Sequence, residues 1–441
     1  MLTRDDNELL CKVGPGTPMG NLFRQYWLPA GLANELPDAD GAPLRLRLLS
    51  EDMVAFRTTA GAIGLIAGAC PHRGASLFFG RNEEEGLRCV YHGWKFDTTG
   101  ACVDMPNEPA ESNFKHKIRA TAYECVERGG VLWVYMGPRE TPPEMPQIES
   151  NMLPDGEWNV NAFQVECNWM QRLEGDIDTS HTAFLHNGAL DDKEFAPSTF
   201  AHYVLKDRAP RYQVVETESG AMYGAYRPAQ EDTYYWRIAN FLFPCFSSTP
   251  TGVLGLEVRM GARVPIDDDH CLTISMQAKS KTSSTQQRYG DRPLTNGLPE
   301  LLPNTTGALG RFRTVANRAN DYQIDRQAQK TVSYSGINTI GMQDQAICES
   351  MGPIYDRSRE HLGTSDMMII RTRRRLIEAA RALRDHGAIP PGVDSAATYA
   401  IRSGGVVLPR TANWVEATAG YRTAFTDQPS LTRAVLGGST G

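Results

Sequence analysis

The first third of the chain alternates apolar and polar residues in the way that is typical of half-buried strands. Leu44–Leu48 alternates with a period of two, and Met53–Arg57 and Ala62–Ala67 are short apolar runs separated by a turn that contains glycine. Such a pair of runs predicts a β-hairpin. Val131–Tyr135 is a further compact apolar run, so we expect this part of the chain to be all-β.

The remainder of the chain mixes strand-like and helical patterns. Asn168–Leu185 contains few helix-breaking residues, and Asp366–His386 carries apolar residues at helical spacing, so both predict helices. Several strand-like runs predict an antiparallel sheet: Tyr212–Glu216, Tyr234–Leu242, Leu256–Val264 and Cys271–Gln277. The combination indicates an α+β protein that begins with an all-β part.

A proline-rich stretch separates the two parts. Gly137–Pro146 has four prolines in ten residues, which neither a helix nor a central strand accommodates. We therefore predict two domains, residues 1–150 and residues 151–441. Residues 280–310 are polar and rich in small and turn-forming residues, so we expect an exposed loop there. The arginines of the last helix are predicted to lie on a solvated face: Arg371, Arg373, Arg374 and Arg375.

The amino-acid composition argues against several classes of protein. The 441 residues are 41% hydrophobic and 22% charged, as in an ordinary globular protein, and a net charge of −7 gives no support to nucleic-acid binding. Nine cysteines are too few for a disulfide-stapled secreted scaffold. The charged opening segment resembles no signal peptide, and no apolar run is long enough to span a membrane. We therefore expect a cytoplasmic protein in which a few cysteines could bind metal.

The strongest chemical signal is a pair of short motifs. Cys70-Pro71-His72 and Cys89-Val90-Tyr91-His92 are separated by sixteen residues, and each joins one thiolate to one imidazole. A structural zinc ion and a Rieske [2Fe–2S] cluster both use two cysteines and two histidines. Zinc sites of this composition usually take both cysteines from one half and both histidines from the other, so the mixed halves favour the cluster.

These residues carry a resemblance to a known family. The segment that ends in Tyr91-His92-Gly93-Trp94-Lys95-Phe96 resembles the Rieske domain of the Rieske non-haem iron oxygenases. Further motifs resemble the phthalate-dioxygenase branch, so the resemblance covers most of the chain: Asn7–Leu10, Pro15–Gly20, Tyr26–Pro29, Met351–Ile354 and Glu360–Asp366. It implies a Rieske domain followed by a helix-grip-like catalytic domain, in which helices and an antiparallel sheet hold a mononuclear Fe(II).

The family's iron takes two histidines and one carboxylate, which leaves positions open for O2. The resemblance implies His181 and His186 as the two histidines. Five residues apart on a regular α-helix, they would lie about 140° out of phase. Both can reach one iron only if the helix widens to π register or breaks between them.

The resemblance also implies the carboxylate ligand and a catalytic aspartate. Asp344 matches the family's third ligand, and Glu349 and Asp366 are less favoured candidates. Asp178, three residues before His181, matches the position that hydrogen-bonds a ligating histidine and bridges to a Rieske histidine of a neighbouring subunit. A ring of subunits follows from this role, either a homotrimer or stacked trimers in a hexamer.

The chain lacks a site that could collect electrons from NAD(P)H. It contains no dinucleotide-binding fingerprint after a strand and no plant-type ferredoxin cysteine run. We therefore expect a separate reductase that carries flavin and a [2Fe–2S] cluster. Glu83, Glu84 and Glu85 could guide its docking, although solvated acids are the more ordinary interpretation.

The expected activity is that of a terminal oxygenase that dihydroxylates an aromatic carboxylate, either phthalate-like or a diaryl acid. Monooxygenation or O-demethylation of a methoxylated aromatic acid is the alternative. Arg208, and after it Arg211, could bind the substrate carboxylate in a fork geometry. Phe241, Phe243 and Phe246 could line an apolar pocket, but core packing is favoured. A Rieske electron carrier and a zinc-stabilised binding module remain as hypotheses of other classes.

Overall fold

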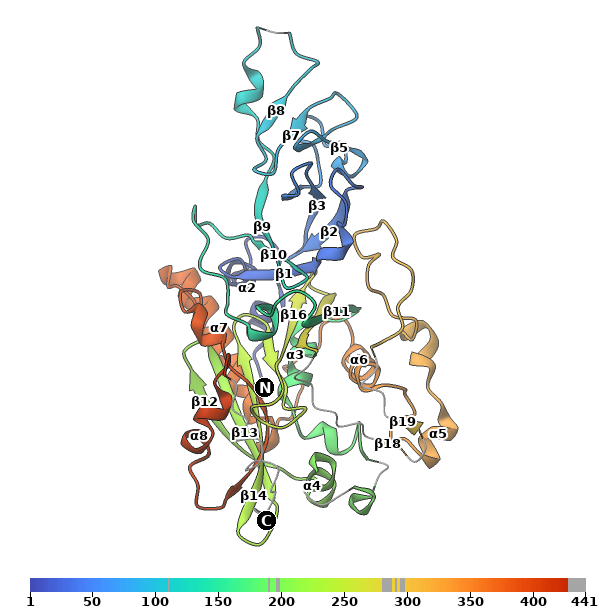
Figure 1. Ribbon diagram of the computed structural model, residues 1–441, viewed down its shortest axis with the longest axis vertical. Coiled ribbons are helices and arrows are strands. Elements are labelled where there is room, and N and C mark those ends of the chain that lie inside the picture. Colours follow the sequence, from blue (N-terminus) through green and yellow to red (C-terminus); the bar gives the residue numbers. More distant parts are fainter. Residues whose placement is uncertain are drawn as a thin grey trace.

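The computed structural model describes residues 1–109, 111–188, 191–195, 199–279, 288–289, 292–293 and 298–426. The molecule is elongated, with a small sheet at one end and the largest sheet at the other (Figure 1). Among the described residues, no helix has the length and apolar character needed to cross a membrane.

The first part of the chain forms an antiparallel sheet, as the alternation predicts. Its strand order is β1-β10-β9-β4-β3-β2. The predicted hairpin is β3–β4, in which Met53 pairs with Ala67 and Arg57 pairs with Ile63. The strands are β1 (Trp27–Leu32), β2 (Leu44–Leu48), β3 (Glu51–Arg57), β4 (Ile63–Ala67), β9 (Ala122–Arg128) and β10 (Val131–Tyr135).

A smaller four-stranded sheet forms the narrow end of the molecule. Its strands, in spatial order, are β5 (Arg81–Glu83), β6 (Gly86–Arg88), β7 (Lys95–Phe96) and β8 (Cys102–Asp104). The first cysteine–histidine motif precedes β5, and the second joins β6 to β7. Cys70 and Cys89 belong to the apolar core of this end, together with Leu87 and Phe96.

The second part is built on an eight-stranded antiparallel sheet of order β11-β17-β16-β15-β14-β13-β12, with β20 paired to β14. The strands are β11 (Trp158–Val165), β12 (Arg211–Thr217), β13 (Gly220–Pro228), β14 (Thr233–Leu242), β15 (Phe246–Ser248), β16 (Arg259–Pro265), β17 (Cys271–Ala278) and β20 (Gly404–Pro409). The strand predicted from Leu256 begins only at Arg259, because the Leu256 N–H donates to the Val253 carbonyl and closes a turn.

The loop predicted over residues 280–310 is described only in part. Residues 288–289 and 292–293 form the short paired strands β18 (Arg288–Tyr289) and β19 (Arg292–Pro293). Residues 280–287, 290–291 and 294–297 lie outside the described part of the chain, and residues 298–310 are irregular.

The predicted helix over Asn168–Leu185 is shorter than expected. The helices of the described chain are α1 (Arg4–Cys11), α2 (Pro18–Phe23), α3 (Trp169–Ile177), α4 (Phe200–Lys206), α5 (Arg326–Thr331), α6 (Ile340–Ser350), α7 (Met367–His386), α8 (Trp414–Ala417) and α9 (Ala419–Arg422). Helix α3 ends at Ile177, because Asp178 has an extended backbone and its carboxylate accepts hydrogen bonds from the Ser180 N–H and hydroxyl. Such side chain–backbone bonds compete with helix continuation.

Helix α7 matches the predicted range, but its arginines do not all face solvent. Arg371 and Arg374 are exposed and pair with surface glutamates, as predicted. Arg373 is buried and forms ion pairs with Glu174 and Glu360. Arg375 is mostly buried and donates to the Thr217 carbonyl, so the prediction is wrong for these two residues. Residues two apart lie on different sides of a helix, so neighbouring arginines of one basic run can face the solvent and the protein interior.

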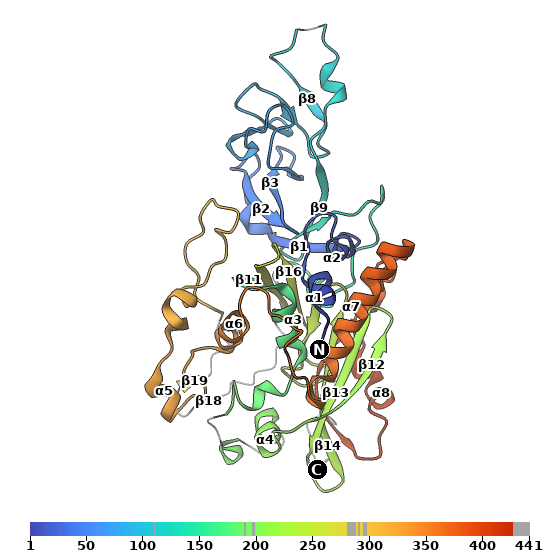
Figure 2. The ribbon, with the colours of Figure 1, turned by 180° about the vertical axis from the view of Figure 1, so that it is seen from behind.

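One hydrophobic core joins the two parts of the chain. Trp133 of β10 stacks on Phe246 of β15, with ring centroids 6.0 Å apart, and Phe23 of α2 packs edge-on against Trp169 of α3. Helices α1 and α2 lie against α7, which covers β12 and β13 (Figure 2). The N-terminal helices therefore pack on the second part of the chain. The domain division at residue 150 stays a prediction.

Candidate metal centres

The two cysteine–histidine loops have matching backbones. In each loop the cysteine carbonyl accepts from the N–H of a glycine four residues later, at 2.9 Å for Gly74 and 3.0 Å for Gly93. Both glycines have φ near 80°, a conformation that glycine adopts without strain. Each cysteine N–H in turn donates to the carbonyl five residues on, at 2.8 Å in both loops. The two motifs therefore present their ligands from equivalent turns.

The side chains of these loops converge. His72 Nδ1 and His92 Nδ1 are 3.1 Å apart, and both cysteines are buried. Burial raises the pKa of the Cys70 thiol to about 11, so its thiolate needs a nearby cation to form at neutral pH. Two buried thiols and two facing imidazoles fit a Rieske cluster, in which one iron takes the sulfurs and the other takes the nitrogens.

Trp94 supports one of these histidines. Its ring stacks on His72 with a centroid distance of 4.3 Å and an interplanar angle of 16°. The Trp94 Nε1–H donates to Asn107 Oδ1 at 2.7 Å, which fixes the indole. The orientation of the His72 ring is therefore set by packing as well as by its loop.

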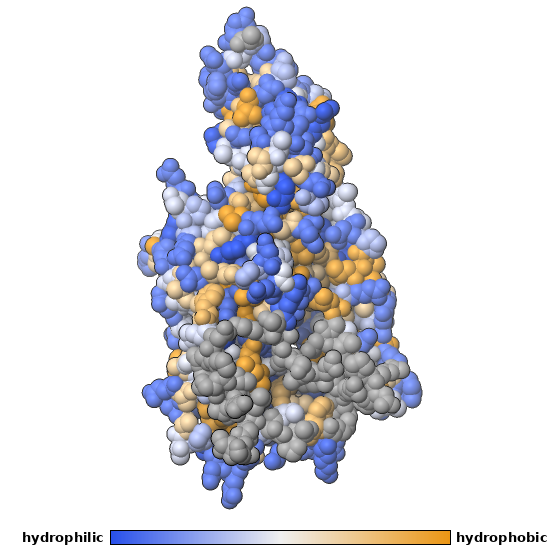
Figure 3. All heavy atoms as spheres, in the orientation of Figure 1, coloured by the Kyte–Doolittle hydropathy of each residue, from blue (hydrophilic) through white to orange (hydrophobic). Residues whose placement is uncertain are grey.

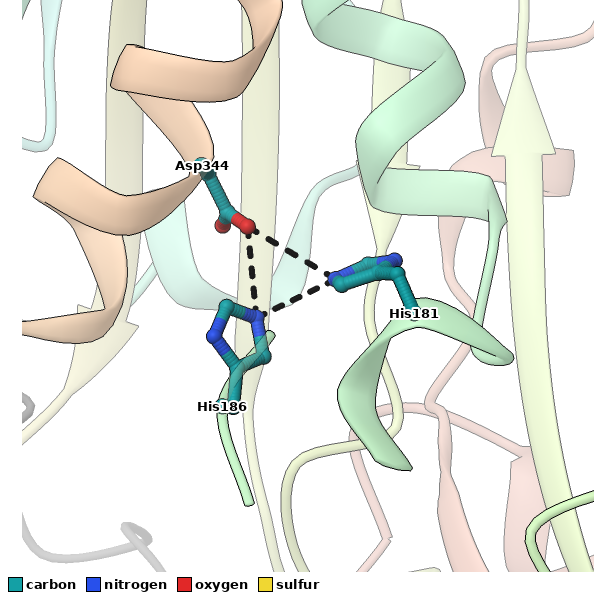
Figure 4. A group of neighbouring side chains, drawn as sticks. All are labelled: His181, His186 and Asp344. Carbon is teal, nitrogen blue, oxygen red and sulfur yellow. Dashed lines mark hydrogen bonds and ion pairs between the residues drawn. The ribbon is translucent and has the colours of Figure 1, made fainter. Parts of the chain in front are cut away.

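A second group of ligand atoms lies in the other part of the molecule. The His181 and His186 Nε2 atoms are 3.1 Å apart, and Asp344 Oδ1 lies 3.6 Å from the first and 3.2 Å from the second (Figure 4). Among the described residues this group could hold a metal ion, with one ligand atom from each side chain. Two imidazoles and one carboxylate are the ligand set of a non-haem Fe(II) site.

The irregular backbone after α3 makes this convergence possible. His181 begins the short 3-10 helix His181–Ala183, and His186 lies in the turn that follows. The 3-10 helix ends at Phe184, so the helical backbone is interrupted between the two histidines. This is one of the two arrangements that their spacing allows. Asp344 comes from α6, far along the chain.

The other nitrogen of each histidine has its own partner. His181 Nδ1 lies 3.2 Å from Asp178 Oδ2, and His186 Nδ1 lies 2.7 Å from Gln343 Oε1. An Nδ1–H that donates to an oxygen leaves the Nε2 lone pair free for a metal. The expected contact between Asp178 and a histidine is present, although both residues lie beyond the end of the helix. Gln343 is a residue whose role the sequence did not indicate.

The charges of the site suit a divalent cation. Burial acts to raise the pKa of Asp344, but the neighbouring His186, Arg172 and His181 hold it well below its ordinary value. Burial acts likewise on Asp178, and its hydrogen bonds from His181 and Ser180 lower its pKa. Both carboxylates are therefore ionised at neutral pH. His186 is almost fully buried, whereas 23% of the His181 side chain is exposed.

The less favoured carboxylates lie elsewhere. Glu349 is buried and accepts hydrogen bonds from Gln345, Tyr322 and the Glu166 N–H. Asp366 accepts from the Gly363 N–H at the start of α7. Neither belongs to the group formed by His181, His186 and Asp344.

The predicted substrate arginines differ in position. Arg208 Nη1 donates to the carbonyls of Ala183 and Gly188, at 3.2 and 3.4 Å, and so contacts the segment that carries both histidines. Arg211 has a 59% exposed side chain at the start of β12 and pairs with Asp207. The predicted pocket phenylalanines instead lie in the buried core: Phe241, Phe243 and Phe246.

The acidic run beside the cluster loops is engaged within the chain. Glu83 pairs with Arg81 and Arg88, and Glu84 lies 3.2 Å from the Lys95 ammonium. Glu85 accepts from the Ala60 N–H. These contacts order the turn between β5 and β6. A docking role for the acids stays a prediction.

The Gln343→Leu variant is expected to weaken iron binding. The change leaves the buried His186 Nδ1–H without an acceptor, and the loss of such a partner lowers metal affinity by about ten- to a hundredfold. A Fe(II) titration of the iron-depleted protein measures the effect. Gln345→Leu, which alters a buried glutamine on the same helix without touching a histidine, is the control and should keep wild-type affinity.

Comparison with known proteins bears on both centres. Residues 26–125 match the family model described as Rieske [2Fe-2S] domain, and residues 134–432 match the one described as LigXa C-terminal domain like. The chain is 45% identical to the 3-chlorobenzoate-3,4-dioxygenase oxygenase subunit of Comamonas testosteroni, over 94% of this chain and 97% of the relative. The chain belongs to the Rieske non-haem iron oxygenases.

Two other relatives of this Rieske oxygenase are also named as oxygenase subunits. It is 35% identical to the phthalate 4,5-dioxygenase oxygenase subunit of Pseudomonas putida, over 97% of each chain. It is 31% identical to the 5,5'-dehydrodivanillate O-demethylase oxygenase subunit of a Sphingobium strain, over 89% of this chain and 82% of the relative. A solved structure of dicamba monooxygenase shares the fold, with a TM-score of 0.55 at 16% identity over 82% of this chain and 99% of that one.

Family membership confirms several predictions. The chain is an oxygenase with a Rieske [2Fe–2S] cluster and a mononuclear iron, in an all-β N-terminal domain and an α+β catalytic domain. The name of the chlorobenzoate relative, an oxygenase subunit, agrees with the expectation that electrons come from a separate component. The hypotheses of a simple electron carrier and of a zinc-stabilised module are therefore abandoned.

Proposed function

We propose that this chain is the terminal oxygenase that dihydroxylates an aromatic carboxylate with O2 and electrons from a flavin- and [2Fe–2S]-containing reductase. The observation that carries the proposal is the convergence of His181, His186 and Asp344 beside Asp178. Relatives that are named for the oxygenation of chlorobenzoate and phthalate support the substrate class.

The ligands follow from the two converging groups. Cys70, His72, Cys89 and His92 would hold the cluster, and His181, His186 and Asp344 would hold Fe(II). When bound, the cluster supplies single electrons and the Fe(II) supplies O2 activation. Asp178 and Gln343 keep each histidine in the tautomer that presents Nε2, and Asp344 remains ionised. His186 is shielded from solvent, while the partly exposed His181 marks the side from which a substrate would approach.

We propose a ring of subunits, either a homotrimer or stacked trimers. The sheet with the cluster loops lies at one end of the chain, away from α3 and α6 (Figures 1 and 2), so a neighbouring subunit could offer a shorter electron path to Asp178. Figure 3 shows apolar side chains among polar ones at this end. The exposed large hydrophobic residues there are Phe79, Val90, Tyr91, Val103 and Phe114. Because thiolates and the reductase require reducing conditions, we also propose a cytoplasmic location.

Two arginines are proposed to bind the substrate carboxylate. Arg237 is 3% exposed, and its Nη1–H donates to Thr182 Oγ1 at 3.3 Å, next to His181. Its Nη2–H donates to the Pro250 carbonyl, so both of these partners are neutral oxygens. A buried cation with neutral partners gains most from an incoming anion. Arg208, which contacts the backbone of the same segment, is the second candidate.

The Arg237→Gln variant is expected to raise KM for an aromatic carboxylate by about ten- to a hundredfold, since a charge-assisted hydrogen bond contributes about 1.5–3 kcal/mol. Steady-state O2 uptake measures the change, and iron content should remain that of the wild type. Arg211→Gln, at the surface, is the control. An unchanged KM in both Arg237→Gln and Arg208→Gln would contradict carboxylate binding by these residues.

O-demethylation of a methoxylated aromatic acid is the second candidate function. The relative named as a dehydrodivanillate O-demethylase favours it. The same metal centres serve both reactions, and the pose of the ring decides which bond is attacked. Formation of formaldehyde distinguishes demethylation from dihydroxylation.

Substrate-dependent O2 uptake across a panel of acids tests the proposed function. The reductase is supplied with NADH, and the panel holds monocarboxylated, dicarboxylated, methoxylated and diaryl acids. We expect at least one acid to stimulate uptake and to give a dihydrodiol or a hydroxylated product. If no acid stimulates uptake by protein with both centres loaded, the proposed function is wrong.

A further inference from the structure

The two oxygens of Asp344 face different partners. Oδ1 faces the Nε2 atoms of His181 and His186, at 3.6 and 3.2 Å. Oδ2 faces the guanidinium of Arg172, with Nη2 at 3.7 Å. Arg172 comes from α3, and its side chain is only 5% exposed. A buried cation therefore lies behind the one carboxylate of the iron site.

Arg172 is itself held in place. Its Nη1–H donates to Asp176 Oδ1 at 2.8 Å, one helical turn later on α3. The other oxygen of Asp176 accepts from Arg263 Nη2 at 2.6 Å and from Ser247 Oγ at 2.5 Å. Strands β15 and β16 thus anchor Asp176, and Asp176 anchors Arg172. Since a guanidinium is planar and rigid, this fixes the direction of Nη2.

The buried charges of this group cancel only when Asp344 of the iron site is counted with them. Two arginines, Arg172 and Arg263, are buried with two aspartates, Asp176 and Asp344. Asp176 already has a full cationic partner in Arg263 and a hydroxyl donor in Ser247. Neutralisation of Asp176 therefore does not account for Arg172, whereas its proximity to Asp344 does.

We propose that Arg172 is a positioning residue that holds Asp344 Oδ2 away from the metal, so that the carboxylate offers a single oxygen. This inference rests on the proposed role of Asp344 as an iron ligand. A carboxylate that is free to rotate could bind through both oxygens and would fill a position that O2 needs. Groups beyond the ligands commonly orient them in this way.

The Arg172→Gln variant tests the proposal through nitric oxide, which binds Fe(II) at an open position as O2 does. The readout is the electron paramagnetic resonance signal of the iron–nitrosyl form, recorded during an NO titration of the Fe(II)-loaded protein. We expect the half-saturating NO concentration to rise by about tenfold and the symmetry of the signal to change. Arg172→Lys, which keeps the charge, should recover part of the wild-type behaviour.

Arg402→Gln is the matched control, because it removes another buried arginine, which pairs with Glu149 and reaches neither Asp176 nor Asp344. It should keep the wild-type NO titration. If Arg172→Gln does not fold, Arg172→Lys, which lacks the planar guanidinium, is titrated in its place and should show a smaller shift in the same direction. A wild-type titration in the folded Arg172 variant, or the same change in Arg402→Gln, overturns the proposal. Retention of iron by Asp344→Ala would instead refute the ligand assignment of the proposed function.

Discussion

The Asp344→Ala variant is expected to lose the mononuclear iron and to keep the Rieske cluster. Asp344 supplies the only carboxylate oxygen within reach of both Nε2 atoms among the described residues, so its removal leaves a site of two neutral imidazoles. Two imidazoles hold Fe(II) poorly without an anionic ligand. Activity should fall by more than about a hundredfold, because even the loss of a hydrogen-bond partner behind a ligand can cost that much.

Iron analysis together with the visible spectrum measures this outcome, because the cluster is coloured and lies in the other part of the chain. Glu349→Gln is the matched control. Glu349 is a buried acid on the same helix, and its hydrogen bonds involve Glu166, Gln345 and Tyr322 and no histidine. It should keep its iron. Full activity of Asp344→Ala would show that another carboxylate is the third ligand.

The Asp178→Asn variant is expected to keep both metal centres and to lose the electron transfer between them. The side-chain amide has the shape of the carboxylate, and its oxygen can still accept from His181 Nδ1, so iron should stay bound. The two hydrogen bonds from Ser180 to the other carboxylate oxygen are lost. The charge that would link His181 to a histidine of the neighbouring cluster is lost. We expect the cluster of the reduced protein to reoxidise at least about tenfold more slowly with substrate and O2.

Stopped-flow absorbance of the cluster measures this rate. Ser180→Ala, which removes a hydroxyl donor to Asp178 but keeps its charge, is the control and should differ little from the wild type. If Asp178 only orients His181, the variant will lose iron affinity while loaded protein reoxidises at the wild-type rate. That result would contradict the bridging role.

The cluster loops show how much the sequence could predict. Their ligands lie within a short segment, and glycine at the same place in both loops gives each the same turn. The residue types and their spacing were therefore enough to indicate a Rieske cluster. The strands of the first part were predictable for a similar reason, because one face of each is buried and the alternation is local.

The segment between α3 and His186 could be predicted only in part. Its composition suits a helix, but the Asp178 carboxylate captures the Ser180 N–H and ends α3 at Ile177. Propensity does not reveal which of two hydrogen-bonding arrangements a polar residue will choose. The five-residue spacing of the histidines does indicate an irregular backbone, and the helical backbone is interrupted between them.

The remaining parts of the iron site depend on tertiary structure. Asp344 lies on a helix far along the chain, and only the family resemblance pointed to it. Gln343 and Arg172 acquire their roles because α6 and α3 pack together, which a single sequence does not reveal. Arg373 likewise has the sequence context of a surface residue, but the mostly buried Glu174 and the buried Glu360 lie beside it.

A single-turnover experiment with labelled oxygen tests whether this chain itself transfers oxygen to an aromatic acid. Protein with both centres loaded is reduced chemically, freed of reductant, and mixed with 18O2 and the acid that gives the highest uptake. We expect a hydroxylated product that carries 18O, formed without reductase while the cluster becomes oxidised, and no product from Asp344→Ala. Oxidation of the cluster without labelled product in the fully loaded wild type would contradict it.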